Sequence, residues 1–297
     1  MPEGNEFLDS RLTSVFCDSE IGRYVPSVDQ IRAVVTDNTK VLLIPNLIGN
    51  VPDWKAIREA FPALILIEDS ADTITTTHES DISTTSFYAS HVITAGGVGG
   101  MVMFNDDAHL KRAIMFRDWG RIGDNVEEPS ERFNHSVDGI PYDWKFLYGV
   151  AGYHLKACEM NAAFGLAQWA KLDGLLAKRR ANVERYLENM KDTNYYLLPD
   201  DSRKPNWLAI PLMCPDRLEC LKFLEANGVQ TRVCFAGNIT RHPAWRNYLK
   251  EFEGADHVMR DGFLLGAHHG MTFDDVDYVC NLLKEFETCS VNVSTAN

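Results

Sequence analysis

Three carboxylates follow a short apolar run near residue 65. Residues 65–67 (Ile-Leu-Ile) lead into Glu68 and Asp69, and Asp72 comes three residues later. A continuous apolar run is typical of a buried strand in a parallel sheet, and ligands of open α/β sheets bind at the carboxyl edge of such strands. A carboxylate at that edge can hold a ring nitrogen of a ligand in its protonated form. The alternative is that Asp69 and Asp72 cap the segment that follows.

A serine, a histidine and a glycine-rich run come next. Ser86 lies in a second strand-like run over residues 84–88, His91 follows it by five residues, and glycines fill most of positions 96–100. A serine hydroxyl can bind a phosphate oxygen, an imidazole can act as acid or base near neutral pH, and glycines let the backbone approach a ligand closely. An ordinary turn between strands explains the glycine run equally well.

The elements that must position these residues alternate between strand-like runs and helical patterns, which indicates an α/β fold. The predicted N-caps are Ser27 and Asn50, with Pro52 in a first turn. Continuous apolar strands separated by helices indicate a parallel sheet that helices cover on both faces. The predicted strands cover 12–17, 41–45, 63–69, 84–88 and 101–104, and the predicted helices begin at 28, 54 and 107.

A length of 297 residues favours two domains. Residues 1–190 are predicted to form a large α/β domain, in which the polar segment 117–148 is typical of a functional loop or lid. One long helix over 159–190 ends this domain. Residues 191–297 are predicted to form a small α+β domain with a frayed tail after Glu287. Its expected strands are 207–212, 229–235 and 262–265, and its expected helices are 220–226 and 276–286.

The chain carries 29 Lys and Arg residues against 42 Asp and Glu residues, a formal net charge of −13. This surplus repels phosphate backbones, and no basic stripe interrupts it, so the composition argues against nucleic-acid binding. The first residues lack the pattern of a signal peptide, and the longest apolar stretches fall short of the ~20 residues of a membrane helix. The sequence therefore predicts a cytoplasmic protein with no membrane partner.

Seven cysteines are scattered along the chain without any Cys-x-x-Cys pair. The odd number and the spacing argue against a disulfide framework and against a zinc site. We expect these thiols to be small buried apolar residues of a protein in a reducing compartment.

Five motifs with chemically useful residues occur in one order along the chain. They are Glu68-Asp69-x-x-Asp72, Ser86-Phe87-Tyr88-x-x-His91, Arg117-Asp118-Trp119-Gly120-Arg121, Gly152-Tyr153-x-x-Lys156 and Phe235-Ala236-Gly237-Asn238-x-Thr240-Arg241. This order resembles the DegT/StrS family of pyridoxal-phosphate (PLP) sugar aminotransferases, and within it the branch of nucleotide-linked 4-keto-6-deoxyhexose 3-dehydratases. The resemblance covers nearly the whole chain. It implies the fold type I of PLP-dependent transferases, with a parallel or mixed sheet in the large domain.

The resemblance implies a role for each matching residue. Asp69 would pair with the pyridinium nitrogen, Asp72 would lie beside the ring, and Ser86 would bind the cofactor phosphate. His154 stands where the family has an asparagine that reaches the cofactor phosphate of a neighbouring subunit, which implies a homodimer. His91 stands where the aminotransferases carry the lysine that holds the cofactor covalently.

Imidazole cannot form that covalent bond, and the sequence has no lysine between Lys55 and Lys111. A histidine suits pyridoxamine phosphate (PMP), from whose methylene group His91 would remove a proton while the C3 hydroxyl of the sugar leaves. L-Glutamate would then regenerate PMP. The implied reaction is the C3 dehydration of a nucleotide-linked 4-keto-6-deoxyhexose in deoxysugar or lipopolysaccharide biosynthesis.

One subgroup of these dehydratases holds an iron–sulfur cluster through cysteines in the first motif and just after the third. Here Ala71 and residues 122–125 (Ile-Gly-Asp-Asn) stand at those positions. Because iron–sulfur clusters need thiolate ligands, the sequence predicts no such cluster.

Substrate contacts are expected from the loop and from the second domain. Arg117 and Arg121 would face the nucleotide diphosphate as bidentate donors, and solvated surface arginines are the alternative. The paired histidines lack a carboxylate at metal-ligand spacing, so we expect hydrogen bonding from them and no metal site. The expected contacts in the second domain are Asn238, Thr240, Arg241, His268 and His269.

Three departures from the family bear on activity. His154 replaces an asparagine, and the glycine run 96–100 lacks the glutamate of the family. Family members also carry a segment, before the strand that matches 12–17, that supplies a phosphate-binding turn and an aromatic residue on the ring. We therefore expect a large domain that is incomplete at its N-terminus, and a chain that by itself is aggregation-prone or needs a partner and binds the cofactor weakly. The alternatives are a sugar aminotransferase, against which the missing lysine argues, and a non-catalytic fragment or one half of a split enzyme.

Overall fold

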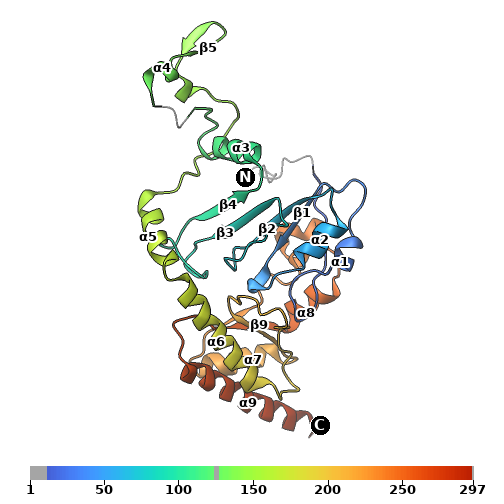
Figure 1. The fold of residues 1–297 in the computed structure, drawn as a ribbon. Helices are drawn as coiled ribbons and strands as arrows, with labels where there is room; N and C mark the ends of the chain where they lie inside the picture. Colours follow the sequence, from blue (N-terminus) through green and yellow to red (C-terminus); the bar gives the residue numbers. More distant parts are fainter. Residues whose placement is uncertain (1–11, 124–126, 296–297) are drawn as a thin grey trace.

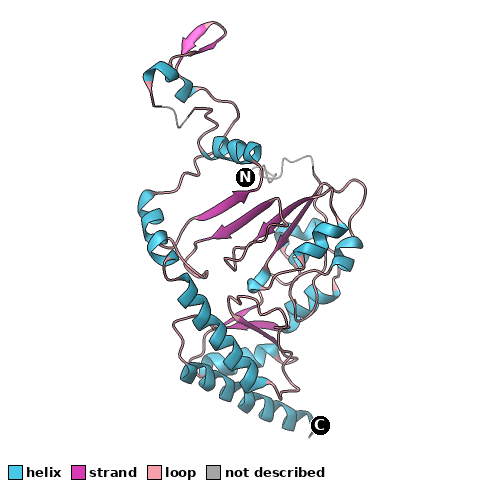
Figure 2. Cartoon of the chain, in the orientation of Figure 1, coloured by secondary structure: helices cyan, strands magenta, loops and turns pink. Residues whose placement is uncertain are grey.

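A four-stranded mixed sheet is built from the first part of the chain (Figure 1, Figure 2). The computed structural model describes residues 12–123 and 127–295. The strand order is β1-β2-β3-β4, in which β1, β2 and β3 run parallel and β4 runs antiparallel to β3. The strands are β1 (Val41–Pro45), β2 (Ile65–Asp69), β3 (Ile82–Ser86) and β4 (Gly100–Phe104). Together with its helices, this mixed sheet confirms the predicted α/β class.

Two short helices, α1 (Val28–Arg32) and α2 (Trp54–Ala60), cover one face of this sheet. Their apolar side chains and those of the facing strands form one cluster, made of Ile31, Ile44, Trp54, Ile57 and Leu66. On the opposite face Leu43 and Ile65 are 60% and 41% exposed. The expectation of helices on both faces is therefore wrong for the part of the chain that the structure describes, because alternate strand residues remain exposed.

The predicted cap at Ser27 is confirmed, and the predicted cap at Asn50 is wrong. The Ser27 hydroxyl accepts the N–H of Gln30 at 3.3 Å, and the Gln30 side chain accepts the N–H of Ser27 at 2.9 Å. Asp53 caps α2 instead, and its carboxylate accepts a first-turn N–H at 3.0 Å. The Asn50 side chain donates to the carbonyl of Arg23 at 2.7 Å, so it braces the preceding loop.

Residues 12–17 form no strand, contrary to the prediction, and lie as irregular chain against the C-terminal part. Phe16 packs edge-on against two aromatic rings there, with centroids 6.0 and 5.4 Å away. The carboxylate of Asp18 accepts two first-turn N–H groups of α8 (Glu253–Asp261), at 3.0 and 2.9 Å. The apolar pattern of this segment therefore serves packing and capping, which leave its backbone outside any sheet.

A small hairpin projects beyond the sheet between α3 (Asp107–Arg117) and α5 (Glu159–Trp169) (Figure 1). In the segment 117–148 the described residues form no long element after α3, as predicted. The structure also contains short elements here, which are too short to show a periodic pattern in the sequence. These are α4 (Pro129–Arg132), β5 (His135–Val137), β6 (Ile140–Tyr142) and the 3-10 turn η3 (Trp144–Phe146).

The single helix predicted over 159–190 is two helices, α5 and α6 (Leu172–Met190), separated at residues 170–171. Within the described residues α5 buries no side chain, whereas α6 buries several, including Val183 and Tyr186. α6 packs along the final helix, so its apolar face belongs to the C-terminal core.

The C-terminal part contains an antiparallel sheet of order β7-β9-β8 against which helices pack, in agreement with the predicted α+β character. Its strands are β7 (Ile210–Met213), β8 (Thr231–Val233) and β9 (Gly262–Leu265), and its helices are α7 (Arg217–Ala226), α8 and α9 (Phe273–Thr295). Because α9 continues to Thr295, the frayed tail predicted after Glu287 is wrong up to that residue. The domain boundary at residue 190 stays a prediction. No helix among the described residues has the length and apolar character needed to span a membrane.

Candidate active site

Asp69 ends β2 on the open face of the sheet. Because side chains alternate along a strand, it points to the same side as Ile67 and away from Glu68. Its Oδ1 accepts the hydroxyl of Thr84, its register partner on β3, at 3.1 Å. The same oxygen accepts the N–H of Ala71 at 3.0 Å. The carboxylate is thus fixed at the edge where α/β sheets bind ligands.

Glu68, to which the sequence motifs assign no separate role, is fully buried at the centre of a polar network. Its two oxygens accept hydrogen bonds of 2.7–3.3 Å from Asn46, Ser70, Thr77, Ser80 and Ser83. A buried carboxylate needs this many donors to offset its lost hydration. The network joins the end of β1, the loop after β2 and the start of β3, and that loop carries Asp72. The sequence signal for a buried Glu68 is the alternation of side chains along the strand, which puts Glu68 on the same face as Leu66.

Asp72 and His91 meet at the end of the sheet. The His91 Nε2 lies 3.8 Å from the Asp72 Oδ1, and the two side chains are 17% and 14% exposed. The other carboxylate oxygen of Asp72 accepts the N–H of Ile48, which adopts a positive φ of 59°, at 2.8 Å. Burial raises the pKa of the Asp72 carboxyl, while the Ile48 hydrogen bond and the charge of a protonated His91 lower it. The structure therefore pairs an imidazole with a partly desolvated carboxylate.

His91 lies in a turn that positions both of its ring nitrogens. The backbone N–H of His91 donates to the carbonyl of Tyr88 at 3.1 Å, and the His91 and Tyr88 rings meet edge-on with centroids 6.0 Å apart. While Nε2 faces Asp72, Nδ1 is buried and has no hydrogen-bond partner among residues 12–123 and 127–295. Since a buried polar atom is costly when it is unpaired, this nitrogen is suited to a ligand.

Ser86 and the glycine run border the same end of β3. The Ser86 hydroxyl accepts the N–H of Tyr88 at 3.2 Å, and Ser86 pairs with Gly100 on β4. Gly96, Gly97 and Gly99 adopt φ values of 74°, 92° and 97°, which glycine adopts without strain. This turn is therefore specified by its glycines, as the sequence pattern suggested.

Arg121 and His154 lie against Trp119, and Arg117 binds the adjacent Asp118. Nε and Nη2 of Arg117 each donate to the buried carboxylate of Asp118 at 2.8 Å. The His154 ring stacks on Trp119 with centroids 4.3 Å apart and planes 14° apart, and the Arg121 guanidinium lies 4.7 Å from the Trp119 centroid. The two basic loop motifs, far apart in sequence, thus form one cluster.

Asn238, Thr240 and Arg241 form a second cluster, around Asp256. Asn238 donates to Asp256 at 2.8 Å and accepts both the N–H and the hydroxyl of Thr240, at 3.1 and 2.6 Å. Arg241 binds both oxygens of Asp256 through Nε and Nη2. The Arg241 ion pair holds the pKa of the Asp256 carboxyl well below its usual range. Hydrogen bonds within the protein thus occupy these three predicted substrate contacts.

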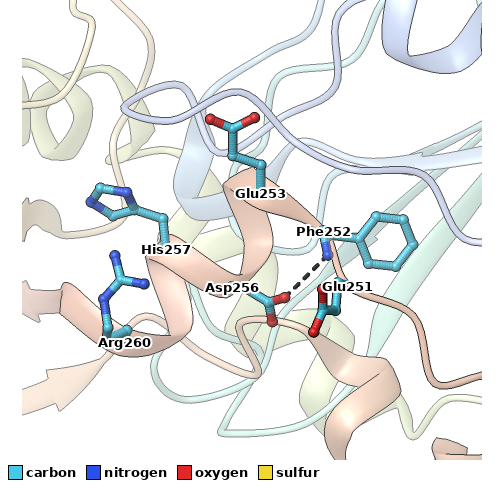
Figure 3. A pocket seen from close by; sticks show the side chains of 6 residues that line it. All are labelled: Glu251, Phe252, Glu253, Asp256, His257 and Arg260. Carbon is cyan, nitrogen blue, oxygen red and sulfur yellow. Dashed lines mark hydrogen bonds between the residues drawn. The ribbon is translucent and has the colours of Figure 1, made fainter.

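A pocket lies over the first turns of α8, beside this cluster (Figure 3). Its side chains belong to Glu251, Phe252, Glu253, Asp256, His257 and Arg260. Asp256 accepts the N–H of Phe252 at 3.1 Å, and His257 lies 3.3 Å from the buried Asp261. Three carboxylates against one arginine disfavour an anionic ligand here, so the candidate active site stays with Asp69, Asp72 and His91.

His268 and His269 follow β9, with ring centroids 6.3 Å apart. The Nδ1 of His268 accepts the N–H of Gly270 at 3.2 Å, and its carbonyl accepts the side chain of Asn182 at 2.9 Å. Within the described ranges no three His, Cys, Asp or Glu side chains are placed to hold a metal ion.

Of the predicted site residues, the structure brings together Asp69, Asp72, Ser86 and His91, and places the others in the clusters described above.

Two curated proteins are similar over nearly the whole chain. The lipopolysaccharide biosynthesis protein RfbH of Salmonella typhimurium is 33% identical over 95% of this chain and 70% of its own length. The dTDP-4-dehydro-2,6-dideoxy-D-glucose 3-dehydratase of Saccharopolyspora spinosa is 32% identical over 95% of this chain and 66% of its own length. The chain thus spans about two thirds of the length of these relatives.

A solved structure shares the fold. The crystal structure of a GDP-4-keto-6-deoxymannose-3-dehydratase with a trapped PLP-glutamate geminal diamine superposes with a TM-score of 0.79, at 23% identity, over 90% of this chain and 74% of that one. The predicted fold type I of PLP-dependent transferases is thereby confirmed. The family model of the DegT/DnrJ/EryC1/StrS aminotransferases matches residues 4–284. As the predicted motifs indicated, the chain belongs to the DegT/DnrJ/EryC1/StrS aminotransferase family.

Proposed function

We propose that the protein removes the C3 hydroxyl of a nucleotide-linked 4-keto-6-deoxyhexose with bound PMP, in the biosynthesis of a deoxysugar or a surface polysaccharide. The observation that carries this proposal is the pair of His91 and Asp72 at the end of β2 and β3. A histidine there supports proton transfer without a covalent hold on the cofactor, and no lysine lies between Lys55 and Lys111. The 3-dehydratase among the relatives supports the same reaction.

The residues at this end of the sheet fit the cofactor. Asp69 would hold the pyridine nitrogen protonated, since its carboxylate is fixed at the ligand-binding edge. Ser86 would donate to the cofactor phosphate from the adjacent strand. His154, stacked on Trp119, would bind a phosphate in a second copy of the chain, which makes a homodimer part of the proposal. The buried Nδ1 of His91, for which the described residues offer no hydrogen-bond partner, would face the bound ligand.

When bound, PMP would supply an amino group that condenses with the sugar ketone and a ring that accepts electrons. His91 Nε2 faces Asp72, so a neutral imidazole directs its N–H to the carboxylate and leaves the Nδ1 lone pair for the substrate side. Nδ1 would accept the proton that carbon–hydrogen cleavage releases, and Asp72 would stabilise the imidazolium that results. The C3 hydroxyl would then leave as water, taking with it the proton that Nδ1 accepted.

Substrate and amino donor complete the proposal. Arg117 and Arg121 would face the diphosphate as bidentate donors. His268 would contact the substrate from the C-terminal part, and Asn238 and Arg241 would do so by exchanging their hydrogen bonds with Asp256. L-Glutamate is the proposed amino donor, supported by its presence in the structurally similar dehydratase. No iron–sulfur cluster is part of the proposal, because residue 71 is alanine.

The test follows the fate of the sugar oxygens. The chain is incubated with PLP, L-glutamate and a nucleotide-linked 4-keto-6-deoxyhexose, and the product is analysed by mass spectrometry. Dehydration removes the C3 oxygen, whereas amination replaces the C4 oxygen by an amino group. A product that keeps its C3 oxygen and gains nitrogen would overturn the proposal in favour of an aminotransferase.

A further inference from the structure

Arg179 on α6 is a buried cation whose Nε–Nη2 edge receives no acceptor from the residues that the structure describes. The residue is 5% exposed, and its Nη1 donates to the carbonyl of Leu208 at 2.9 Å. Its Nε is buried and has no hydrogen-bond partner in the described part of the chain. Burial lowers the pKa of the guanidinium to about 10. Burying a charge without an opposite charge costs free energy, so this guanidinium favours binding of an anion.

Other arginines of this chain show how such an edge is used. In each of them Nε and Nη2 together bind the two oxygens of one carboxylate, in the planar geometry typical of arginine. These pairs are Arg117–Asp118, Arg132–Asp143, Arg185–Asp277 and Arg241–Asp256. The same edge of Arg179 therefore has the shape that receives an oxyanion.

Two histidines, His268 and His269, lie close to the helix that carries this guanidinium. Asn182, one turn after Arg179 on α6, donates to the carbonyl of His268 at 2.9 Å and so holds the histidine pair against the helix. The Nδ1 of His269 is also buried without a hydrogen-bond partner in the described ranges. Burial and the charge of Arg179 lower the pKa of both imidazoles, and the charge of Lys178 adds to the effect on His269. The cluster is thus electropositive in a chain whose net charge is −13.

Asp275 is an acidic side chain near this cluster, and its charge partly offsets the lowering of the His268 pKa. Its Oδ2 accepts the N–H and the hydroxyl of Thr272, both at 2.7 Å, at the start of α9. This carboxylate is therefore engaged in a cap.

We propose that Arg179, His268 and His269 bind a small oxyanion, either a carboxylate or a phosphate group. The Nε–Nη2 edge of Arg179 receives two of its oxygens, and the imidazoles complete its hydrogen bonds. This site adds a buried arginine to the substrate contact predicted at His268. Its test needs neither PLP nor sugar, so it can fail independently of the proposed dehydration.

The first experiment follows the imidazole signals of the intact chain by NMR. Sodium phosphate and sodium acetate are titrated in separate arms, with sodium chloride at matched ionic strength as the control. We expect saturable shifts of the His268 and His269 signals with one oxyanion and none with chloride, and the arm that saturates at lower concentration identifies the source. Absence of saturable shifts in both arms overturns the proposal.

Matched charge variants then assign the site. Arg179→Gln removes the buried guanidinium, and Arg180→Gln removes an adjacent one whose partners are Asp201 and Glu184. Calorimetry should show binding weakened by about tenfold or more in Arg179→Gln, and unchanged within about twofold in Arg180→Gln. Equal affinity in Arg179→Gln and the wild type overturns the assignment. If circular dichroism shows that Arg179→Gln is unfolded, His269→Gln decides: weaker binding supports the site, and unchanged binding overturns it.

Discussion

The imidazole of His91 and the carboxylate of Asp72 face each other with Nε2 and Oδ1 3.8 Å apart. Separate segments of the chain hold these two residues in place. Asp72 is fixed by the N–H of Ile48, and His91 by a turn closed on the carbonyl of Tyr88. The parallel pairing of β2 with β3 brings the two loops to one edge. An imidazole and a carboxylate held in this way form an acid–base pair on which the proposed chemistry depends.

His91→Asn should abolish dehydration without unfolding the protein. Asparagine cannot accept a proton near neutral pH, so we expect the rate of C3-oxygen loss to fall by about 10²–10⁴-fold. The rate is measured by product mass, and circular dichroism checks the fold. His109→Asn, an exposed substitution on α3, serves as the control and should keep the wild-type rate. A rate within twofold of wild type in His91→Asn would show that His91 is not the base.

Asp72→Asn should change how stability depends on pH. Burial raises the pKa of Asp72 above its unfolded value of about 3.9, so the folded state binds this proton more tightly than the unfolded state. The stabilisation by this proton is complete at low pH and is lost as pH rises through the raised pKa. The asparagine variant does not titrate there and keeps an acceptor for the Ile48 N–H. Its free energy of unfolding relative to wild type should therefore increase from about pH 4 upwards, as measured by urea unfolding. A relative stability that falls over that range contradicts the assignment.

Glu68→Gln should destabilise the large sheet. The carboxylate accepts hydrogen bonds from five residues, and a side-chain amide replaces one acceptor oxygen by a donor that faces other donors. Leaving buried donors unsatisfied costs ~1–3 kcal/mol, so we expect a loss of this size in urea unfolding. Glu59→Gln, on the exposed side of α2, is the matched control and should change stability by less than ~0.5 kcal/mol. Equal effects of the two substitutions would show that the network does not stabilise the fold.

Asp18→Ala should release the first turn of α8. Loss of an N-cap costs ~1 kcal/mol, and here it also detaches residues 12–17 from the C-terminal part. Gly254→Ala should cost more, since a Cβ at this position would lie 1.8 Å from the carbonyl oxygen of Ser19. Thermal unfolding should therefore rank the three proteins as wild type, Asp18→Ala and Gly254→Ala in falling stability. Proteolysis of residues 12–20 should accelerate in the same order.

Local sequence patterns predicted the elements whose sequence signal is itself local. The apolar runs at β1, β2 and β9 and the N-cap at Ser27 are visible in a few consecutive residues, and these elements lie where the patterns placed them, although the strands pair with distant segments. The same patterns were wrong for residues 12–17, because an apolar segment that packs on distant aromatic rings has the composition of a strand. They also missed the break between α5 and α6, where no proline or glycine marks the end of the helical pattern at Ala170.

By itself, the sequence determined the family and the chemical types at the candidate site, because a histidine in place of lysine and five ordered motifs are properties of composition and spacing. Only the tertiary structure decided which of these groups act together. It turned Glu68 into a buried support and left Asp69 at the open edge, since the pleat sends neighbouring residues to opposite faces. It also engaged Arg241 with Asp256 and left the Nε of Arg179 without a described partner. Such pairings depend on how distant segments pack against one another, and the spacing of residues along the chain does not predict this packing.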